Sequence, residues 1–170
     1  MYSSDLGRAH DTAKIIVSQN QVNSDDSNIK QTELAREQHL PGFEHKPVQA
    51  YWDNLTALGY TSIPRDFKVE GGESRNDMVE RSGKLILQIA EEAFKPENQW
   101  KRILLASHTM WICESQNFAA HYNTGEDYTN REKMKNCSVS ILEVEKLTAE
   151  GAPKPYKFNY VVVSDDAHLE

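Results

Sequence analysis

The sequence predicts an α/β fold, and three observations lead to that class. The run from Arg102 to His108 holds three consecutive apolar residues followed by small ones, which is typical of a short strand buried on both faces. Helical periodicity precedes it at 74–93 and follows it at 110–122. Two further apolar runs, 137–144 and 156–163, indicate a hairpin-type pair of strands. The expected order is therefore helix first, a mixed middle, and two final strands at the edge of an α/β sheet.

Length, charge and cysteine content restrict the class of protein. The 170 residues are enough for one domain with a substantial core, and no break in composition divides them, so we expect a single domain over residues 1–170. The net charge of −7 gives no general attraction for nucleic acid or anionic membrane. No apolar run approaches the ~20 residues of a membrane span, and we expect a cytoplasmic protein. Cys113 and Cys137 fit no metal or disulfide spacing and are expected to be buried, reduced thiols.

Two amphipathic helices are expected in the first half of the chain. The first begins near Leu6, with Ser4 or Asp5 as its cap. The second covers 47–58 and ends at Gly59. Their apolar faces are formed by Ala9, Ala13, Ile16 and Val17 in the first, and by Val48, Tyr51, Trp52, Leu55 and Leu58 in the second.

The clearest helix, at 74–93, has a start signal of its own. Ser74 with Asp77 three residues later fits a capping box in its acidic form. A short strand is expected at 29–35, and polar loops at 20–30 and 124–135. A turn at Gly151-Ala152-Pro153 separates the last two strands.

Two cationic side chains are candidates for a binding site. His108 ends the buried strand, and in an open α/β sheet that end faces the crevice where ligands bind. The alternative is a neutral histidine that bonds a nearby carbonyl, and the sequence favours neither. Arg8 lies in the first turn of its helix, where a cation opposes the helix dipole unless an anion is bound there. Arg8 is then a phosphate ligand; a solvated surface arginine is the alternative.

The segment after residue 35 is rich in groups that can carry protons. Glu37, His39, Glu44 and His45 lie within nine residues and could form an acid–base or metal cluster. Their spacing matches no metal signature, so a polar loop is the favoured alternative.

Several motifs are spread over most of the chain, from Tyr2 to about Val163. In order they are Ser3-Ser4-Asp5-Leu6-x-Arg8-Ala9-x-x-Thr12-Ala13, Arg36-Glu37 with Glu44 seven residues on, Gly71-Gly72-Glu73-Ser74 leading to Arg81, Ser107-His108, and Cys137-Ser138-Val139-Ser140. Together they resemble the histidine phosphatase superfamily, the phosphoglycerate-mutase-like phosphomonoesterases and mutases. The resemblance implies a phosphoglycerate mutase-like three-layer α/β sandwich.

The resemblance also implies a chemistry. In the family one histidine becomes phosphorylated, two arginines and a second histidine hold the phosphoryl oxygens, and a glutamate protonates the leaving oxygen. By position, Arg8 resembles a phosphate arginine and His108 the second histidine. Glu37 resembles the proton donor, whose carboxyl must stay protonated near neutral pH. No metal or other cofactor is implied, and the implied ligand is a small phosphorylated metabolite such as a sugar phosphate or phosphoglycerate.

The chain departs from the family pattern at its start. The family's first strand, which ends in Arg-His-Gly and carries the nucleophile, is missing, so we expect an N-terminally truncated, incomplete domain without turnover. Smaller departures are Pro41 and His45, and Thr109 after the second histidine, where the family usually has glycine. None of the remaining histidines lies in an Arg-His-Gly context: His10, His39, His45, His121 and His168.

The missing strand has a structural consequence. In the family it is central, between the strand that ends at His108 and the strand that begins near Cys137. Strands 103–106 and 139–142 are then expected to have unpaired edges, where each buried unpaired amide or carbonyl costs about 1–3 kcal/mol. We expect the chain to self-associate through these edges, recruit a strand, or be marginally stable.

Two functions are compatible with this pattern. The first is an incomplete phosphomonoesterase, whose parent hydrolyses or transfers phosphate through a phosphohistidine. The second is a non-catalytic phosphate-binding or regulatory module. An in-frame apolar strand ending in Arg-His-Gly, encoded upstream of Met1, would favour the first.

Overall fold

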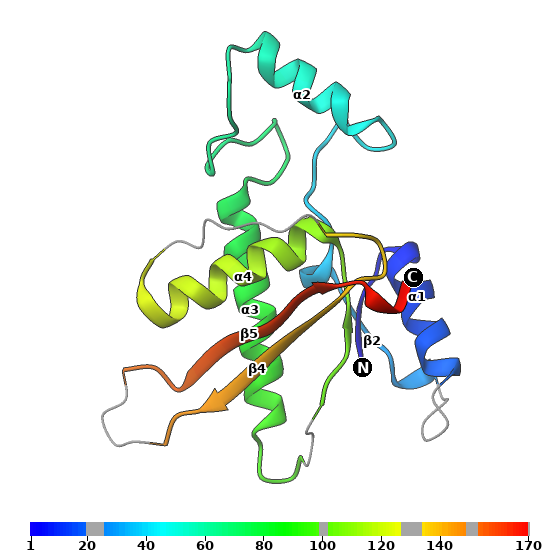
Figure 1. Ribbon diagram of the computed structural model, residues 1–170, viewed down its shortest axis with the longest axis vertical. Helices are drawn as coiled ribbons and strands as arrows, with labels where there is room; N and C mark the ends of the chain where they lie inside the picture. Colours follow the sequence, from blue (N-terminus) through cyan, green and yellow to red (C-terminus); the bar gives the residue numbers. More distant parts are fainter. Residues whose placement is uncertain (20–25, 99–101, 127–133, 149–152, 170) are drawn as a thin grey trace.

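The computed structural model describes residues 1–19, 26–98, 102–126, 134–148 and 153–169. Its helices and strands confirm an α/β fold with a parallel sheet (Figure 1). The strands are β1 (Tyr2–Ser4), β2 (Lys30–Thr32), β3 (Leu105–Ala106), β4 (Val139–Lys146) and β5 (Tyr156–Asp165). The helices are α1 (Gly7–Ser18), α2 (Val48–Ala57), α3 (Arg75–Ala93) and α4 (Thr109–Thr124), with 3-10 turns at Asp26–Asn28, Glu33–Ala35 and Ala167–Leu169.

The first strand, β1, is the centre of a parallel sheet with the order β2-β1-β3. Tyr2 is in register with Lys30 on one side and with Leu105 on the other. The prediction that the chain opens with a helix is therefore wrong. The segment Tyr-Ser-Ser has no apolar run to mark it as a strand; Ser3 and Ser4 are fully buried because neighbouring strands cover them. Their hydroxyls are hydrogen-bonded, and Ser3 Oγ donates to the Ser4 carbonyl.

The last two strands, β4 and β5, pair with each other in antiparallel fashion, which confirms the hairpin-type pairing. Within the described residues they form a sheet of their own, so their predicted place at the edge of the α/β sheet is wrong. Residues alternate between the two faces of this pair, as the strand period requires. Leu142 and Val144 pack towards the core, whereas Val139 and Ile141 are exposed. Within the described part of the chain, β3 is hydrogen-bonded only to β1, and β4 only to β5.

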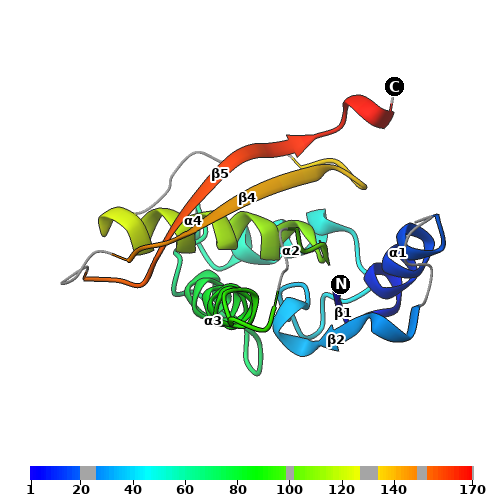
Figure 2. The same ribbon diagram turned by 90° about the horizontal axis from the view of Figure 1, so that it is seen from below.

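The main core lies where α3, α4 and β5 pack together. Figure 2 shows α4 between the β4–β5 pair on one side and α3 on the other. Gly83 of α3 permits the close approach of the helices, since a Cβ there would lie 2.2 Å from the Phe118 ring of α4. The buried residues of this cluster are Ala35, Met78, Leu85, Ile86, Ala90, Trp111, Ala119, Tyr156 and Phe158.

The strand that is expected over residues 102–108 is shorter and less buried than predicted. Only Leu105 and Ala106 form β3, and Leu104 is 41% exposed. The apolar run predicts a strand covered on both faces, but Leu105 is only half-buried and Ala106 alone of β3 is buried. Similarly, the strand expected at 29–35 is limited to β2, because the chain turns into a 3-10 helix at Glu33.

Local predictions at helix ends and cysteines are correct in part. The capping box of Ser74 and Asp77 is present at the start of α3. The cap of α1 is Leu6, not Ser4 or Asp5, because Asp5 is held by a distant arginine. Of the two free thiols, Cys113 is buried but Cys137 is exposed, because its turn precedes β4 at the surface.

The helix α2 projects from the rest of the molecule beyond the amino-terminal end of α3 (Figure 1). Its predicted apolar face is only partly covered: Tyr51 and Leu55 are buried, whereas Trp52 and Leu58 are exposed. Gly59 ends the helix with φ of +83°, a value that favours glycine. The predicted loops at 20–30 and 124–135 and the turn at 151–153 lie partly outside the described residues.

Candidate functional site

Arg8 and His108 meet although one hundred residues separate them in the sequence. The strands β1 and β3 are parallel neighbours, so their carboxyl ends lie at the same edge of the sheet. The first turn of α1 follows β1, and His108 follows β3 as the N-cap residue of α4. At this edge Arg8 Nε donates a hydrogen bond to His108 Nδ1 over 3.1 Å.

These contacts fix the protonation state of His108. An arginine Nε can only donate, so His108 Nδ1 is the acceptor and the ring proton lies on Nε2, 3.0 Å from Ser4 Oγ. Burial, followed by the charges of Arg8 and Arg81, lowers the pKa of His108 to about 4, against a smaller opposing effect of Asp5. The ring is therefore neutral at pH 7, and its partners are a guanidinium and a hydroxyl rather than a carbonyl.

Glu37 lies beside the start of α4. Its Oε1 accepts hydrogen bonds from the backbone N–H groups of Gln38 (2.9 Å) and Met110 (3.2 Å). The carboxyl thus fills the capping role at the helix N-terminus, where the His108 side chain makes no capping bond. Burial raises the pKa of Glu37, while the two backbone N–H groups and the charges of Arg8 and Arg81 oppose that rise. A raised pKa is the direction that a proton donor needs near neutral pH.

An ion pair links the loop after β1 to the segment that carries Glu37. Arg36 Nε donates to Asp5 Oδ1 over 2.8 Å, and this contact lowers the pKa of Asp5. Because Asp5 precedes α1 and Arg36 precedes Glu37, the pair holds the Arg8 helix next to the Glu37 segment. Sequence analysis missed this contact, since nothing in the spacing of the two residues pairs them.

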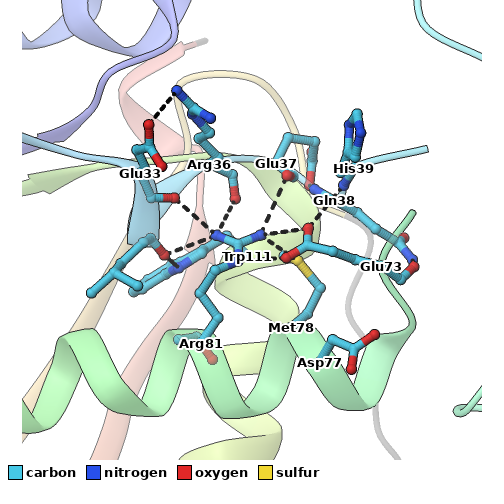
Figure 3. A network of polar contacts seen from close by, with 12 residues as sticks. Glu33, Arg36, Glu37, Gln38, His39, Glu73, Asp77, Met78, Arg81 and Trp111 are labelled. Atoms are coloured by element: carbon cyan, nitrogen blue, oxygen red, sulfur yellow. Dashed lines mark hydrogen bonds and ion pairs between the residues drawn. The ribbon is translucent and has the colours of Figure 1, made fainter. Parts of the chain in front are cut away.

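Arg81 of α3 is the centre of a polar network (Figure 3). Its guanidinium binds both carboxylate oxygens of Glu73, at 2.8 and 2.9 Å. Glu73 Oε2 also accepts the backbone N–H of His39. Gly72 allows this packing, because a Cβ there would lie 2.9 Å from the His39 carbonyl oxygen. The Gly-Gly-Glu-Ser motif thus fastens its turn to the residues around Glu37, a role that the sequence did not indicate.

The family model described as histidine phosphatase superfamily (branch 1) matches residues 1–150. The chain belongs to the histidine phosphatase superfamily. Solved structures that share its fold include the following three. Bacillus stearothermophilus YhfR is 24% identical, with 99% of this chain and 75% of that chain covered and a TM-score of 0.70.

The other two structures are of a mycobacterial glucosyl-3-phosphoglycerate phosphatase. Its complex with VO3 is 19% identical, with 97% of this chain and 76% of that chain covered and a TM-score of 0.68. Its complex with inorganic phosphate is 20% identical, with 100% and 78% covered and a TM-score of 0.68. No curated protein matches the sequence. At these identities the three structures support the phosphoglycerate mutase-like fold, and they do not by themselves define a substrate.

The acids and histidines of the loop at 37–45 do not form a single cluster. His39 Nδ1 lies 3.6 Å from Glu44 at the surface, whereas the Glu37 carboxyl is turned towards Met110. His45 has φ of +63° in the turn that leads to α2. Among the residues described, no group of three His, Cys, Asp or Glu side chains could hold a metal ion. This geometry favours the polar loop over the acid–base or metal cluster.

A cavity of about 970 Å³ runs along α3 and α4. Arg81 and Leu34 contribute to its lining together with Arg65, Leu87 and Phe118, whereas Arg8, Glu37 and His108 do not. Within the described ranges, no helix is both long and apolar enough to cross a membrane.

Proposed function

We propose that this chain binds the phosphoryl group of a small phosphorylated metabolite beside Arg8 and His108, with Glu37 as the proton donor of the parent reaction. The observation that carries the proposal is the 3.1 Å contact of Arg8 with a buried histidine in a member of this family. Their hydrogen bond leaves the outer N–H groups of the Arg8 guanidinium at the carboxyl edge of the sheet, where an anion can be bound. A phosphate bound beside Arg8 would offset the Arg8 charge, which after burial is the next cause of the lowered His108 pKa.

The chemistry of the two side chains suits a phosphoryl group. In the described part of the chain, the Arg8 guanidinium donates to His108 through Nε, and the residue is exposed. Its outer N–H groups can therefore bind anion oxygens in the forked geometry typical of arginine. The complexes of the mycobacterial phosphatase with VO3 and with inorganic phosphate support an anion of this kind. Sugar phosphates and phosphoglycerates are the metabolites that we expect, in a cytoplasmic protein.

Binding without turnover is the second part of the proposal. The 170 residues contain no Arg-His-Gly motif, and covalent catalysis of the family type needs that histidine. The parent activity is hydrolysis or transfer of phosphate; these 170 residues keep the binding part of it. A non-catalytic regulatory module is the second candidate, and the same absence favours it.

Titration calorimetry at pH 7 with inorganic phosphate and with vanadate tests the binding. Arg8→Ala and His108→Ala should each weaken binding by about 1.5–3 kcal/mol, the scale of a charge-assisted hydrogen bond. Lys14→Ala is the matched control, because Lys14 is an exposed cation on the same helix that lies near Asp11. Equal affinity in all four proteins would remove the assignment, provided that circular dichroism shows them folded.

A further inference from the structure

The segment of residues 33–37, which we call the acid-bearing segment, has an unusual pattern of backbone hydrogen bonds. It is a 3-10 turn followed by extended chain, so neither a helix nor a sheet supplies donors for most of its carbonyls. Arg81 of α3 and Trp111 of α4 do so instead (Figure 3), together with Ser107. The donors are Arg81 for the carbonyls of Glu33, Leu34, Arg36 and Glu37, Ser107 for Ala35, and Trp111 for Leu34.

Arg81 is the main donor to this segment. Its Nη1 lies 2.9 Å from the Leu34 oxygen and 3.0 Å from the Arg36 oxygen, and its Nη2 lies 3.4 Å from the Glu37 oxygen. A planar guanidinium can donate in several directions at once, which a lysine ammonium cannot do with the same fixed geometry. The Arg81 side chain is only 15% exposed, so these bonds are shielded from water.

We propose that Arg81 and Glu73 are a positioning pair for Glu37: Arg81 holds the backbone that places the Glu37 carboxyl against the Met110 N–H, and Glu73 balances the Arg81 charge. The proposal rests on the proposed function only for the role of Glu37 as an acid. The placement itself is a property of the ligand-free protein.

The charges around Glu37 explain why a balancing group is needed. Arg8 from α1 and Arg81 from α3 both favour the ionised carboxylate, which a proton donor must avoid. His108, at the start of α4, is neutral and adds no charge. Glu73 binds Arg81 through both oxygens, so the guanidinium can hold the backbone while its charge is largely offset.

A carbon NMR titration of the Glu37 carboxyl in ligand-free protein tests whether Glu73 offsets the effect of the Arg81 charge on the Glu37 pKa. Arg81→Gln removes a cation and should raise the Glu37 pKa further. Glu73→Gln keeps a hydrogen-bonding side chain but exposes the Arg81 charge, so it should lower the same pKa. Arg65→Gln is the matched control, because it breaks another buried Arg–Glu contact, with Glu114 of α4, that involves no residue of the acid-bearing segment. Shifts of the same sign in the Arg81 and Glu73 variants, or an equal shift in the control, would overturn the proposal.

Hydrogen exchange of the Met110 amide tests whether Arg81 holds the Glu37 carboxyl against the Met110 N–H. Arg81→Lys keeps the positive charge but loses the planar guanidinium with its several donors. The Glu37 pKa should therefore stay near that of the wild type. The protection of the Met110 amide should fall about three- to tenfold, the range of one ordinary hydrogen bond. Unchanged protection would contradict the positioning role, and Glu73→Gln remains informative if the Arg81 variants do not fold. These readouts need no anion, so they can succeed where phosphate binding fails, or fail where it succeeds.

Discussion

The two sides of the candidate site differ in how completely their backbone is bonded. On one side, the acid-bearing segment has a donor for each of its five carbonyls. On the other side, the β3 and β4 edges have no second strand within the described residues, and apolar side chains nearby are exposed. These exposed residues are Leu104, Val139, Ile141 and Val161.

This difference affects two properties of the protein: the placement of the candidate site residues and the stability of the sheets. The groups proposed to bind and protonate are held by contacts with β1, α1, α3 and α4, and β3 reaches them through its paired side, next to β1. The stability of the sheets does depend on those edges, because unpaired strands invite association and exposed apolar area contributes nothing to folding. We therefore expect anion binding to survive where turnover and sheet stability do not.

The largest expected effect is on turnover. Without the phosphorylated histidine, hydrolysis should be slower than in ordinary enzymes of about 1 per second by several orders of magnitude. Assays with para-nitrophenyl phosphate and with bisphosphorylated sugars measure this, and His108→Ala provides the background rate. A rate of about 1 per second or more would mean that another residue acts as the nucleophile.

The next prediction concerns how the free energy of unfolding depends on pH through His108. The pKa of His108 is about 4 in the folded chain, against 6.5 for an unperturbed histidine, so the unfolded chain takes up the proton first as pH falls. The stability from neutral His108 is fully present above pH 6.5 and lost between pH 6.5 and 4, roughly 3 kcal/mol in all. Glu37 acts oppositely, since its raised pKa contributes stability that is lost as pH rises through the folded value.

Urea unfolding at pH 7, 5.5 and 4 measures this loss. His108→Gln removes the titrating ring and should flatten the dependence by roughly the same 3 kcal/mol, while His121→Gln, on the exposed end of α4, should leave it unchanged. An identical pH dependence in wild type and His108→Gln would show that the ring is not held neutral.

The unpaired edges of β3 and β4 should bind an added strand. A peptide with the family's apolar strand ending in Arg-His-Gly can pair between β3 and β4, as donor strands do in other sheet proteins. At a hundredfold excess over Kd it should add about 2.7 kcal/mol of stability and raise the melting temperature by several degrees. A peptide with a central proline is the control, since proline cannot donate to the ladder.

Sedimentation of the free chain completes that test. Unpaired edges predict self-association that the peptide competes away. A stable monomer that is indifferent to the peptide would mean that the edges are closed, and the comparison of the two sides would then fail.

How much of this could be predicted depends on whether the cause is local. The helix α3 and its cap follow from periodicity and from Ser74 and Asp77, which are three residues apart. The strand β1 could not be predicted, because its burial comes from β2 and β3 rather than from its own side chains. The expected double burial of the run before His108 failed for the same reason: coverage of a strand is decided by its neighbours.

In the candidate site, too, some features could be predicted from the sequence and others could not. Motifs that resemble those of a family point to Arg8, Glu37 and His108, and the structure brings Arg8 to His108 and Glu37 to the helix that follows His108. Their roles in binding and protonation remain predictions. The contacts that hold them were not predictable, since the Arg36–Asp5 pair and the bonds of Arg81 to the acid-bearing segment join residues more than thirty positions apart. Spacing in a sequence carries no information about such contacts.

The smallest expected effect tests whether the acid-bearing segment keeps its place when α3 is less stable. Ser74→Ala removes the hydroxyl that accepts the Asp77 N–H at 3.1 Å, and the loss of such a cap costs about 1 kcal/mol. Thr12→Ala is the control: its exposed hydroxyl bonds only within α1, and the change should stay within about 0.5 kcal/mol. Thermal unfolding measures both. Because Glu73 is held by Arg81 and by the His39 N–H, it should keep its place without the cap, and phosphate affinity should match the wild type. A parallel loss of affinity would show that the cap of α3, rather than the polar contacts of Arg81, keeps the site in place.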